Sequence, residues 1–145
     1  MSQQFSIGTA YIDVPHGWRQ VPGPDGDLIV RSPDDRQQVT LNVAQLENPA
    51  TFDDFKRICA VRLKAEKQQL VDGGIEPNPV PFQQNDLFGF VYTGVDRKTR
   101  RMFSTYLSLE TRELVTLYLE SFAVQPNRHI ETFKTLIANL KRDRK

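Results

Sequence analysis

The sequence contains a single cysteine, Cys59, and almost no excess of charge. One cysteine excludes an internal disulfide bond and any metal site that needs several thiolates. The 19 lysine and arginine residues stand against 18 aspartate and glutamate residues, which leaves a formal net charge of +1. A charge this small produces no overall field that would draw the chain to nucleic acid or to an anionic membrane surface.

Long apolar runs are missing as well. No segment approaches the roughly 18 consecutive apolar residues that a membrane-spanning helix needs. The first four residues, Met1 to Gln4, are polar and lack the basic and apolar regions of a secretory signal. We therefore predict a cytoplasmic protein that has no membrane partner.

Residues suited to catalysis are few. Catalysis needs a base with an orienting partner, and we expect His16 in a turn and His129 in the solvated first turn of a helix. Cys59 falls on an apolar helix stripe, and burial there suppresses the reactivity of a thiol. A hydrolase that uses His16, oriented by Asp13 or Asp27, is one alternative function.

Ligand-binding motifs are also absent from the sequence. The segment Asp25–Asp27 resembles the start of a calcium loop, but Arg36 stands where such a loop needs a bidentate glutamate. The glycines fit neither common phosphate-binding fingerprint, and the histidines and the cysteine fit no zinc spacing. The sequence therefore predicts no metal, no cofactor and no enzymatic activity.

What the sequence does contain is the composition of a folded chain. Its 145 residues are 39% apolar and 26% charged, and nine of them are phenylalanine. A chain of this length forms one domain of ordinary size and buries a sizeable core. No repeat, linker or low-complexity tract divides it, so we predict a single domain over residues 1–145.

Hydrophobic periodicity predicts two long helices. Thr51 and Asp54 form a capping-box pattern ahead of an apolar stripe at helical spacing, so the first helix is expected from Thr51 to about Leu70. Pro126 opens the second helix, in which apolar residues recur at helical spacing as far as Leu140.

Strand patterns fill most of the remaining chain. Residues 38–46 alternate between apolar and polar, which is typical of a strand with one buried face. Three longer strands, joined by short turns, form an antiparallel meander at residues 87–95, 101–109 and 114–124. Shorter strands precede residue 31, and residues 80–84 form a short edge strand. This order predicts an α+β fold, a three-layer α/β/α sandwich in which two long helices enclose a twisted antiparallel sheet.

Both faces of the predicted meander are apolar. One set of side chains is mainly aliphatic and comprises Val91, Phe103, Thr105, Leu107, Leu109, Val115, Leu117 and Leu119. The other set is rich in aromatic rings and comprises Phe88, Phe90, Tyr92, Met102, Tyr106, Leu114, Tyr118 and Phe122. A sheet with one solvated face carries polar residues on that face. Something must therefore cover the second face.

Two interpretations of the second face are open. One helix on each face would bury both sets of side chains. Alternatively, part of the aromatic set is exposed and binds another protein or a second copy of this chain. The residues predicted to form this partner-binding surface are Phe90, Tyr92, Met102, Tyr106 and Tyr118. We therefore predict a non-enzymatic protein-binding domain, with a homodimer among the forms that binding could take.

A nucleic-acid-binding function is a further alternative. Arg97, Lys98, Arg100 and Arg101 are clustered at a predicted hairpin turn, and the last five residues carry four more positive charges. Such clusters contact phosphate oxygens in a salt-sensitive way. A solvated turn, and a helix end stabilised by cations, explain the same pattern without nucleic acid.

Parts of the sequence resemble a known fold group. The segment Phe5-Ser6-Ile7, followed by Tyr11-Ile12-Asp13-Val14-Pro15-His16-Gly17-Trp18, is similar to the opening of PsbP-like and Mog-like domains. The stretch from Leu119 through the final helix fits the same layout. This group includes bacterial DcrB-like proteins and the Eag chaperones of type VI secretion. The resemblance implies a three-layer domain that binds proteins without catalysis, and the Eag branch implies a chaperone or adaptor that shields apolar segments of a secreted effector.

Overall fold

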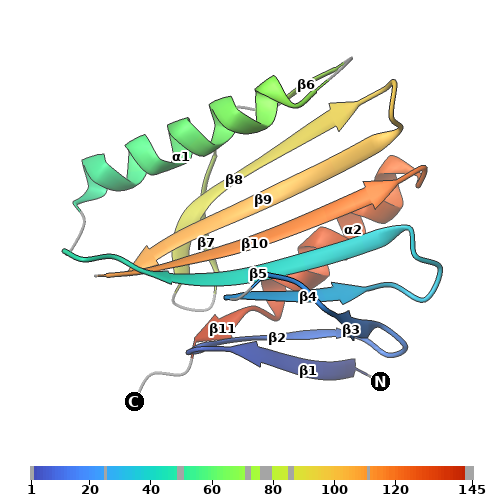
Figure 1. The fold of residues 1–145 in the computed structure, drawn as a ribbon, viewed down its shortest axis with the longest axis horizontal. Coiled ribbons are helices and arrows are strands. Elements are labelled where there is room, and N and C mark those ends of the chain that lie inside the picture. Colours follow the sequence, from blue (N-terminus) through green and yellow to red (C-terminus); the bar gives the residue numbers. More distant parts are fainter. Residues whose placement is uncertain are drawn as a thin grey trace.

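The computed structural model describes residues 2–24, 26–48, 51–70, 73–75, 80–84, 87–110 and 112–142. These residues form two helices and eleven strands, arranged in layers (Figure 1). A large, twisted antiparallel sheet is the middle layer. One helix packs on one of its faces, and the other helix packs on the opposite face together with a small second sheet. The predicted α+β architecture is confirmed.

The large sheet contains the predicted meander and extends it on both sides. Its meander strands are β8 (Leu87–Asp96), β9 (Arg101–Glu110) and β10 (Glu113–Phe122). Next to β10 lie β5 (Gln37–Gln45), then β4 (Asp27–Arg31) and finally β3 (Arg19–Val21). At the other side, β6 (Gly73–Ile75) and β7 (Val80–Gln84) both pair with β8. The sequence does not predict the short strands β3 and β6, because the glycines and prolines in and around them are typical of turns.

A second sheet joins the two ends of the chain. β1 (Ser2–Ile7) and β2 (Ala10–Pro15) form a hairpin, and β11 (Lys141–Arg142) pairs with β2. Ala10, Ile12 and Val14 of β2 are buried against the large sheet. The alternating pattern predicts the hairpin strands. It does not predict the separate sheet, because the pairing of Tyr11 with Lys141 depends on the tertiary fold.

Helix α1 (Phe52–Gln68) begins as the sequence predicts. The Thr51 hydroxyl accepts a hydrogen bond from the Asp54 backbone N–H (3.1 Å), and the Asp54 carboxylate accepts one from the Thr51 N–H (3.0 Å). Phe55 and Cys59, one helical turn apart, are buried against the sheet, which confirms the predicted apolar stripe. Burial raises the pKa of the Cys59 thiol to about 11, so the thiol stays protonated near neutral pH.

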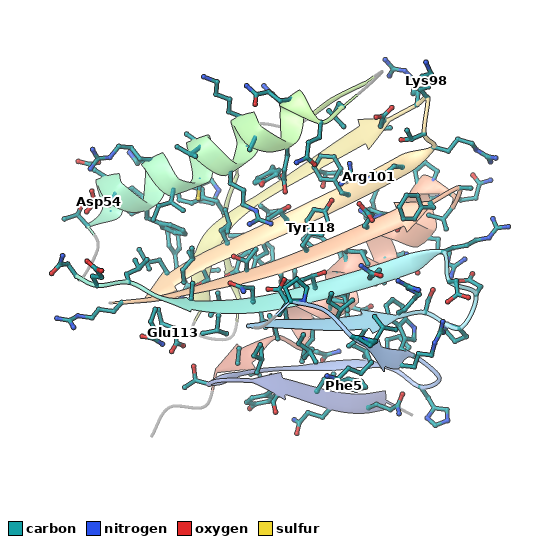
Figure 2. The ribbon with its side chains drawn as sticks, in the orientation of Figure 1. Phe5, Asp54, Lys98, Arg101, Glu113 and Tyr118 are labelled. Carbon is teal, nitrogen blue, oxygen red and sulfur yellow. The ribbon has the colours of Figure 1, made fainter. Side chains whose placement is uncertain are left out.

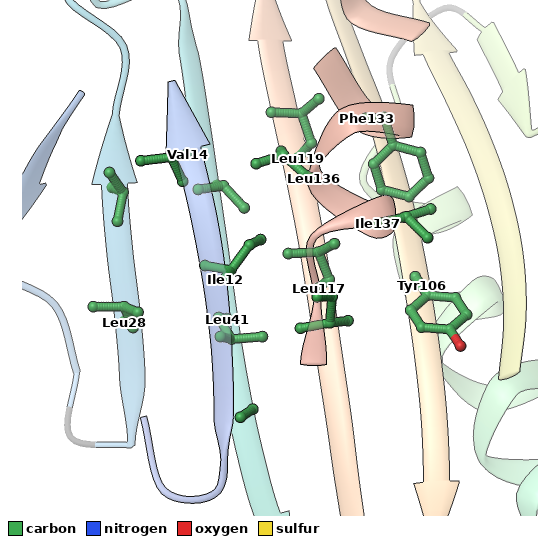
Figure 3. Close-up of a cluster of buried hydrophobic side chains, with 14 of the residues drawn as sticks. Ile12, Val14, Leu28, Leu41, Tyr106, Leu117, Leu119, Phe133, Leu136 and Ile137 are labelled. Carbon is green, nitrogen blue, oxygen red and sulfur yellow. The ribbon is translucent and has the colours of Figure 1, made fainter. Parts of the chain in front are cut away.

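Helix α2 (Pro126–Ala138) confirms the predicted final helix and packs on the opposite face of the sheet. Phe133, Leu136 and Ile137 of α2 are buried among side chains of the large sheet and of β2. Figure 3 shows this cluster, in which Tyr106 of β9 lies among aliphatic side chains. The larger part of the core is therefore on the α2 side.

The predicted division of the meander side chains into two faces is wrong for β9. Thr105 of β9 lies opposite Tyr92 of β8 and also opposite Tyr118 of β10. Odd-numbered residues of β9 therefore share a face with even-numbered residues of its neighbours. The lengths of the two hairpin turns set this offset, and the apolar pattern cannot reveal it when both faces are apolar. Phe103, Thr105, Leu107 and Leu109 consequently lie on the α1 face, and Met102 and Tyr106 lie on the α2 face.

Gly94 provides a test of the packing on the α1 face. It pairs with Phe103, and a Cβ added at Gly94 would lie 2.3 Å from Cζ of that fully buried ring. We expect Gly94→Ala to lower the free energy of unfolding by about 2 kcal/mol, because the ring has to move. Chemical denaturation measures the loss. Gly74→Ala is the matched control, since no atom lies within 4 Å of a Cβ added there; equal losses for the two variants would contradict this packing.

Candidate functional site

Helix α1 covers only part of its face of the sheet. Its buried side chains contact β8 and β9, whereas the helix leaves two hollows beside β10, β5 and β4. Their volumes are about 400 and 290 Å³, and Arg62 of α1 lines both of them. We call the two hollows together the α1 cleft. The apolar end is lined by Arg57, Ile58, Val61, Arg62, Ala65, Leu107 and Leu114, and the polar end by Arg62, Asp27, Thr40, Asn42, Thr116 and Tyr118.

The apolar end of the α1 cleft lies between the helix and strands β9 and β10. Ile58, Val61 and Ala65 form the helix side, and Leu107 and Leu114 form the sheet side. Val61 is 69% exposed. A single exposed valine is ordinary, but this one stands beside a hollow whose other walls are also apolar. An apolar group placed here would remove that surface from water.

Two exposed aromatic rings lie at the start of the same helix. Phe52 of α1 is 53% exposed and Phe88 of β8 is 40% exposed, and their ring centroids are 6.2 Å apart. Both rings contact Phe90, which is buried beneath them. Exposed apolar surface on α1 therefore extends beyond the cleft itself.

The polar end of the α1 cleft continues a row of polar side chains that crosses the sheet. Thr40, Tyr118, Thr105 and Tyr92 lie opposite one another on β5, β10, β9 and β8. Helix α1 covers Thr105 and Tyr92 completely, whereas Thr40 and Tyr118 are half-buried and line the cleft. The row therefore presents hydroxyl groups to the cleft at the point where α1 no longer covers the sheet.

Arg101 organises the polar side chains next to the cleft (Figure 2). Its guanidinium donates hydrogen bonds to the Glu120 carboxylate and to the Tyr118 hydroxyl. The Tyr118 hydroxyl in turn donates to Glu120 at 3.2 Å. Burial raises the pKa of Tyr118 above its usual range, and the negative charge of Glu120 raises it further. Tyr118 is therefore a fixed, neutral hydroxyl at the edge of the cleft.

Glu66 holds Arg62 at the centre of the cleft. The distance from Arg62 Nε to Glu66 Oε1 is 3.5 Å, and the Glu66 side chain is only 12% exposed. Burial raises the pKa of Glu66, while the hydroxyl of Tyr92 and the charge of Arg62 act in the opposite direction. The two residues are one helical turn apart on α1. Their ion pair places a cation where the apolar and polar ends of the cleft meet.

The five side chains predicted to bind a partner are divided between two faces of the sheet. Phe90, Tyr92 and Tyr118 lie on the α1 face, and Met102 and Tyr106 lie on the α2 face. Phe90, Tyr92 and Tyr106 are buried because a helix covers the part of each face where they lie, so Tyr92 and Tyr106 present no surface to a partner of the folded chain. Met102 and Tyr118 are half-buried, and Tyr118 lines the α1 cleft.

The ion pair of Arg62 and Glu66 is not predicted from the sequence. Arg62 and Glu66 have the pattern of solvated charges on an amphipathic helix. Their spacing of four residues is the signal that could have marked them as a pair. It could not have shown that the pair lies over the sheet.

The basic hairpin turn is smaller than its sequence suggests. Arg97, Lys98 and Arg100 are exposed, but Arg101 turns onto the sheet face and pairs with Glu120. The last residues of the basic tail, 143–145, lie outside the described residues. The cluster of cations exposed at the turn is therefore smaller than the sequence predicts.

The prediction that His129 is solvated is wrong, because the structure buries this side chain completely. His129 Nε2 lies 2.8 Å from Ser104 Oγ, and Nδ1 lies 2.7 Å from Ser121 Oγ. The first turn of α2 lies directly against β9 and β10, which the helix pattern alone does not reveal. Burial lowers the pKa of His129 to about 4. Ser121 also stands where a Ser–His hydrolase has a carboxylate, so nothing in this pair stabilises an imidazolium.

The other candidates for chemistry add little. His16, the alternative catalytic base, is exposed in the turn that follows β2. Within the part of the chain that the structure describes, no three side chains of histidine, cysteine, aspartate or glutamate gather where they could hold a metal ion. Neither of the described helices is long and apolar enough to cross a bilayer.

No protein-family model and no curated protein matches the sequence, but solved structures share its fold. Cyanobacterial PsbP (CyanoP) from Synechocystis sp. PCC 6803 is similar, with a TM-score of 0.73 over 97% of this chain and 92% of that chain, at 14% identity. LpqN of Mycobacterium tuberculosis, described as involved in cell envelope biogenesis, has a TM-score of 0.67 over 99% and 91% of the two chains, at 10% identity. Protein Mog1 has a TM-score of 0.53 over 95% and 86%, at 9% identity.

The architecture and these neighbours define an α+β domain of the PsbP-like and Mog-like fold group. Identities this low establish the shared fold alone. The resemblance seen in the N-terminal segment is therefore confirmed for the fold. The likeness to DcrB-like proteins and to Eag chaperones stays a prediction.

Proposed function

We propose that this protein is a non-enzymatic binding domain whose α1 cleft holds an apolar segment of another protein. The observation that carries the proposal is the apolar hollow beside Val61, a volume of about 400 Å³ that is open at the surface and walled by α1, β9 and β10. Its size suits one or two apolar side chains of a partner. The exposed rings of Phe52 and Phe88 would extend the contact along the helix.

The polar end of the cleft suits the main chain or a polar side chain of the same segment. Arg62 provides a donor, Tyr118 provides a hydroxyl, and Asn42 already donates to the Asp27 carboxylate at 2.6 Å. A segment that crosses from the apolar end to the polar end would thus bury its apolar side chains at the first and form hydrogen bonds at the second.

The finer role that we propose is that of a chaperone or adaptor. Such a protein shields apolar segments of a partner, for example a secreted effector, until the partner reaches its destination. The resemblance to the Eag branch supports this role, and so does the involvement of the structural neighbour LpqN in cell envelope biogenesis. A second copy of this chain is the other occupant that the test must distinguish.

Val61→Glu tests the proposal with little risk to the fold. Because Val61 is largely exposed, the change should alter the free energy of unfolding by less than about 0.5 kcal/mol. A carboxylate at the mouth of the apolar hollow should nevertheless reduce partner binding at least about tenfold, since it stays hydrated and opposes burial. The measurement compares affinity capture by the natural chain and by each variant in extracts of the native host. The matched control is Ala60→Glu, which adds the same charge to the next exposed residue of α1.

Three outcomes decide the matter. A partner that Val61→Glu loses and Ala60→Glu retains supports the α1 cleft as the binding site. Equal capture by both variants, or capture of no partner, contradicts it. Sedimentation of the purified chain identifies the remaining occupant, since a dimer that Val61→Glu dissociates would replace the adaptor role with self-association.

A further inference from the structure

A second cavity lies on the opposite face of the sheet from the α1 cleft. It is enclosed by α2 and by strands β7, β8 and β9, and its volume is about 460 Å³. We call it the α2 pocket. Its apolar walls are Phe82, Val91, Ile130, Phe133 and Ile137. Sites for small ligands have volumes of about 300–1,000 Å³ and mainly apolar walls, so the α2 pocket has the dimensions of such a site.

Three polar side chains also line the α2 pocket, and they set what it can bind. Thr93 and Ser104 line it with hydroxyl-bearing side chains from β8 and β9, and Lys134, an exposed residue of α2, lines it as well. The two hydroxyl oxygens lie 2.7 Å apart, so they share a hydrogen bond. Which of them donates decides whether the pocket presents a donor or an acceptor.

A buried chain of hydrogen bonds behind the pocket fixes this direction, starting at Gln37. The Gln37 amide nitrogen donates to Ser121 Oγ at 3.1 Å, and its carbonyl accepts from the Thr132 hydroxyl at 3.3 Å. Ser121 is fully buried and accepts from Gln37, and among its contacts in the described part of the chain His129 Nδ1, 2.7 Å away, is the group that can accept its hydrogen. His129 is therefore in the tautomer with its hydrogen on Nε2.

The same logic continues from His129 to the pocket. His129 Nε2–H donates to Ser104 Oγ at 2.8 Å, and Ser104 then donates to Thr93 Oγ1. The Thr93 hydroxyl is left with its hydrogen for an acceptor in the pocket. The buried network thus turns Thr93 into a hydrogen-bond donor inside an apolar cavity.

From these groups we propose that the α2 pocket is a binding site for a small apolar monocarboxylate. The Thr93 hydroxyl is a donor, Lys134 is the cation among the residues that line the pocket, and both are complementary to a carboxylate. The apolar walls accept a hydrocarbon or aryl body. A neutral alcohol of the same length gains less from Lys134, and an amine is repelled by it.

Binding of octanoate tests the proposal. We expect octanoate to bind the purified chain and to perturb the NMR signals of Val91 and Ile137, which line the α2 pocket. We expect 1-octanol to bind at least about tenfold more weakly, since a hydrogen bond to a charged group is worth more than one to a neutral group. Lys134→Gln should weaken octanoate binding several-fold and reduce its dependence on salt.

Thr93 gives the sharpest pair of variants. Thr93→Val removes the hydroxyl at nearly constant volume and should weaken octanoate binding about tenfold, whereas Thr93→Ser keeps the donor and should bind within about twofold of the natural chain. If Thr93→Val fails to fold, Lys134→Gln and the comparison of octanoate with 1-octanol still decide the outcome. The proposal is overturned if octanoate leaves the pocket signals unchanged at millimolar concentration, or if 1-octanol binds as tightly as octanoate. Perturbations confined to residues of the α1 cleft would overturn it as well.

Discussion

Arg101→Met is expected to lower the free energy of unfolding by about 3 kcal/mol. Arg101 and Glu120 form an ion pair whose side chains are only 17% and 20% exposed. Methionine keeps much of the volume of the arginine stem but removes the charge. The Glu120 carboxylate then stays in a poorly hydrated place. Of its donors Arg101 and Tyr118, it keeps the Tyr118 hydroxyl. An unpaired carboxylate of this kind destabilises a fold more than the loss of the pair itself.

Two further variants separate the ion pair from the charge of the hairpin. The double variant Arg101→Met, Glu120→Gln removes both charges and should regain most of the lost stability, because no unpaired ion is left. Lys98→Met removes one cation from an exposed position of the same turn and should change the stability by less than about 0.5 kcal/mol. Urea denaturation measures all four proteins. A loss for Arg101→Met no larger than that for Lys98→Met would show that the buried ion pair contributes nothing.

The stability of the fold is expected to decrease by about 3 kcal/mol between pH 8 and pH 4 through His129 alone. Burial lowers the pKa of this histidine from 6.5 to about 4. Between these two values the unfolded chain binds a proton that the folded chain does not bind, so acid favours unfolding. The contribution is fully present above pH 6.5 and is lost as the pH falls toward 4.

His129→Gln isolates this contribution, since glutamine does not titrate. We expect the variant to be less stable at pH 8 but to lose about 3 kcal/mol less on acidification than the natural chain. His16→Gln is the matched control, because it makes the same substitution at an exposed histidine. Denaturation at a series of pH values gives the three profiles. Parallel profiles for His129→Gln and the natural chain would contradict this, because they would mean that the pKa of His129 is the same in the folded and the unfolded chain.

Carboxylates that titrate nearby do not obscure this comparison. A hydrogen bond from Arg128 is the main cause that holds the pKa of Asp34 far below its usual value of 3.8, so the stability that Asp34 contributes is lost only below the window of His129. Burial raises the pKa of Glu66, which has the opposite effect: its contribution is present at low pH and is lost as the pH rises. Both groups are unchanged in His129→Gln, so they cancel in the difference.

Local patterns were sufficient for those parts of the fold that local physics decides. The capping box at Thr51 and Asp54, the apolar stripe through Cys59 and the alternation along β5 each express an interaction between residues close in sequence. These elements are where the sequence predicts them. The face to which each β9 side chain points was not predictable in the same way, because it depends on the length of two turns while both faces are apolar.

The candidate sites were predicted less well than the fold, for a similar reason. Tyr118 was identified, but Arg62 was not, because the sequence does not show that α1 leaves part of its face of the sheet uncovered. His129 was misplaced because its two partners, Ser104 and Ser121, are on other strands. Sites made by three or four elements depend on packing between residues far apart in the chain, and single-sequence periodicity carries no information about that packing.

The pairing of β11 with β2 has a mechanical consequence. It comprises two residue pairs, Tyr11 with Lys141 and Ala10 with Arg142, and it ties the last described strand to the N-terminal hairpin. Tension applied between the two ends would separate these two residue pairs before it reached the buried side chain of Leu140. Strands β5, β8, β9 and β10, which carry both cavities, lie further along the path of the force. Tension between the two ends would therefore open this short pairing while the α1 cleft and the α2 pocket keep their shape.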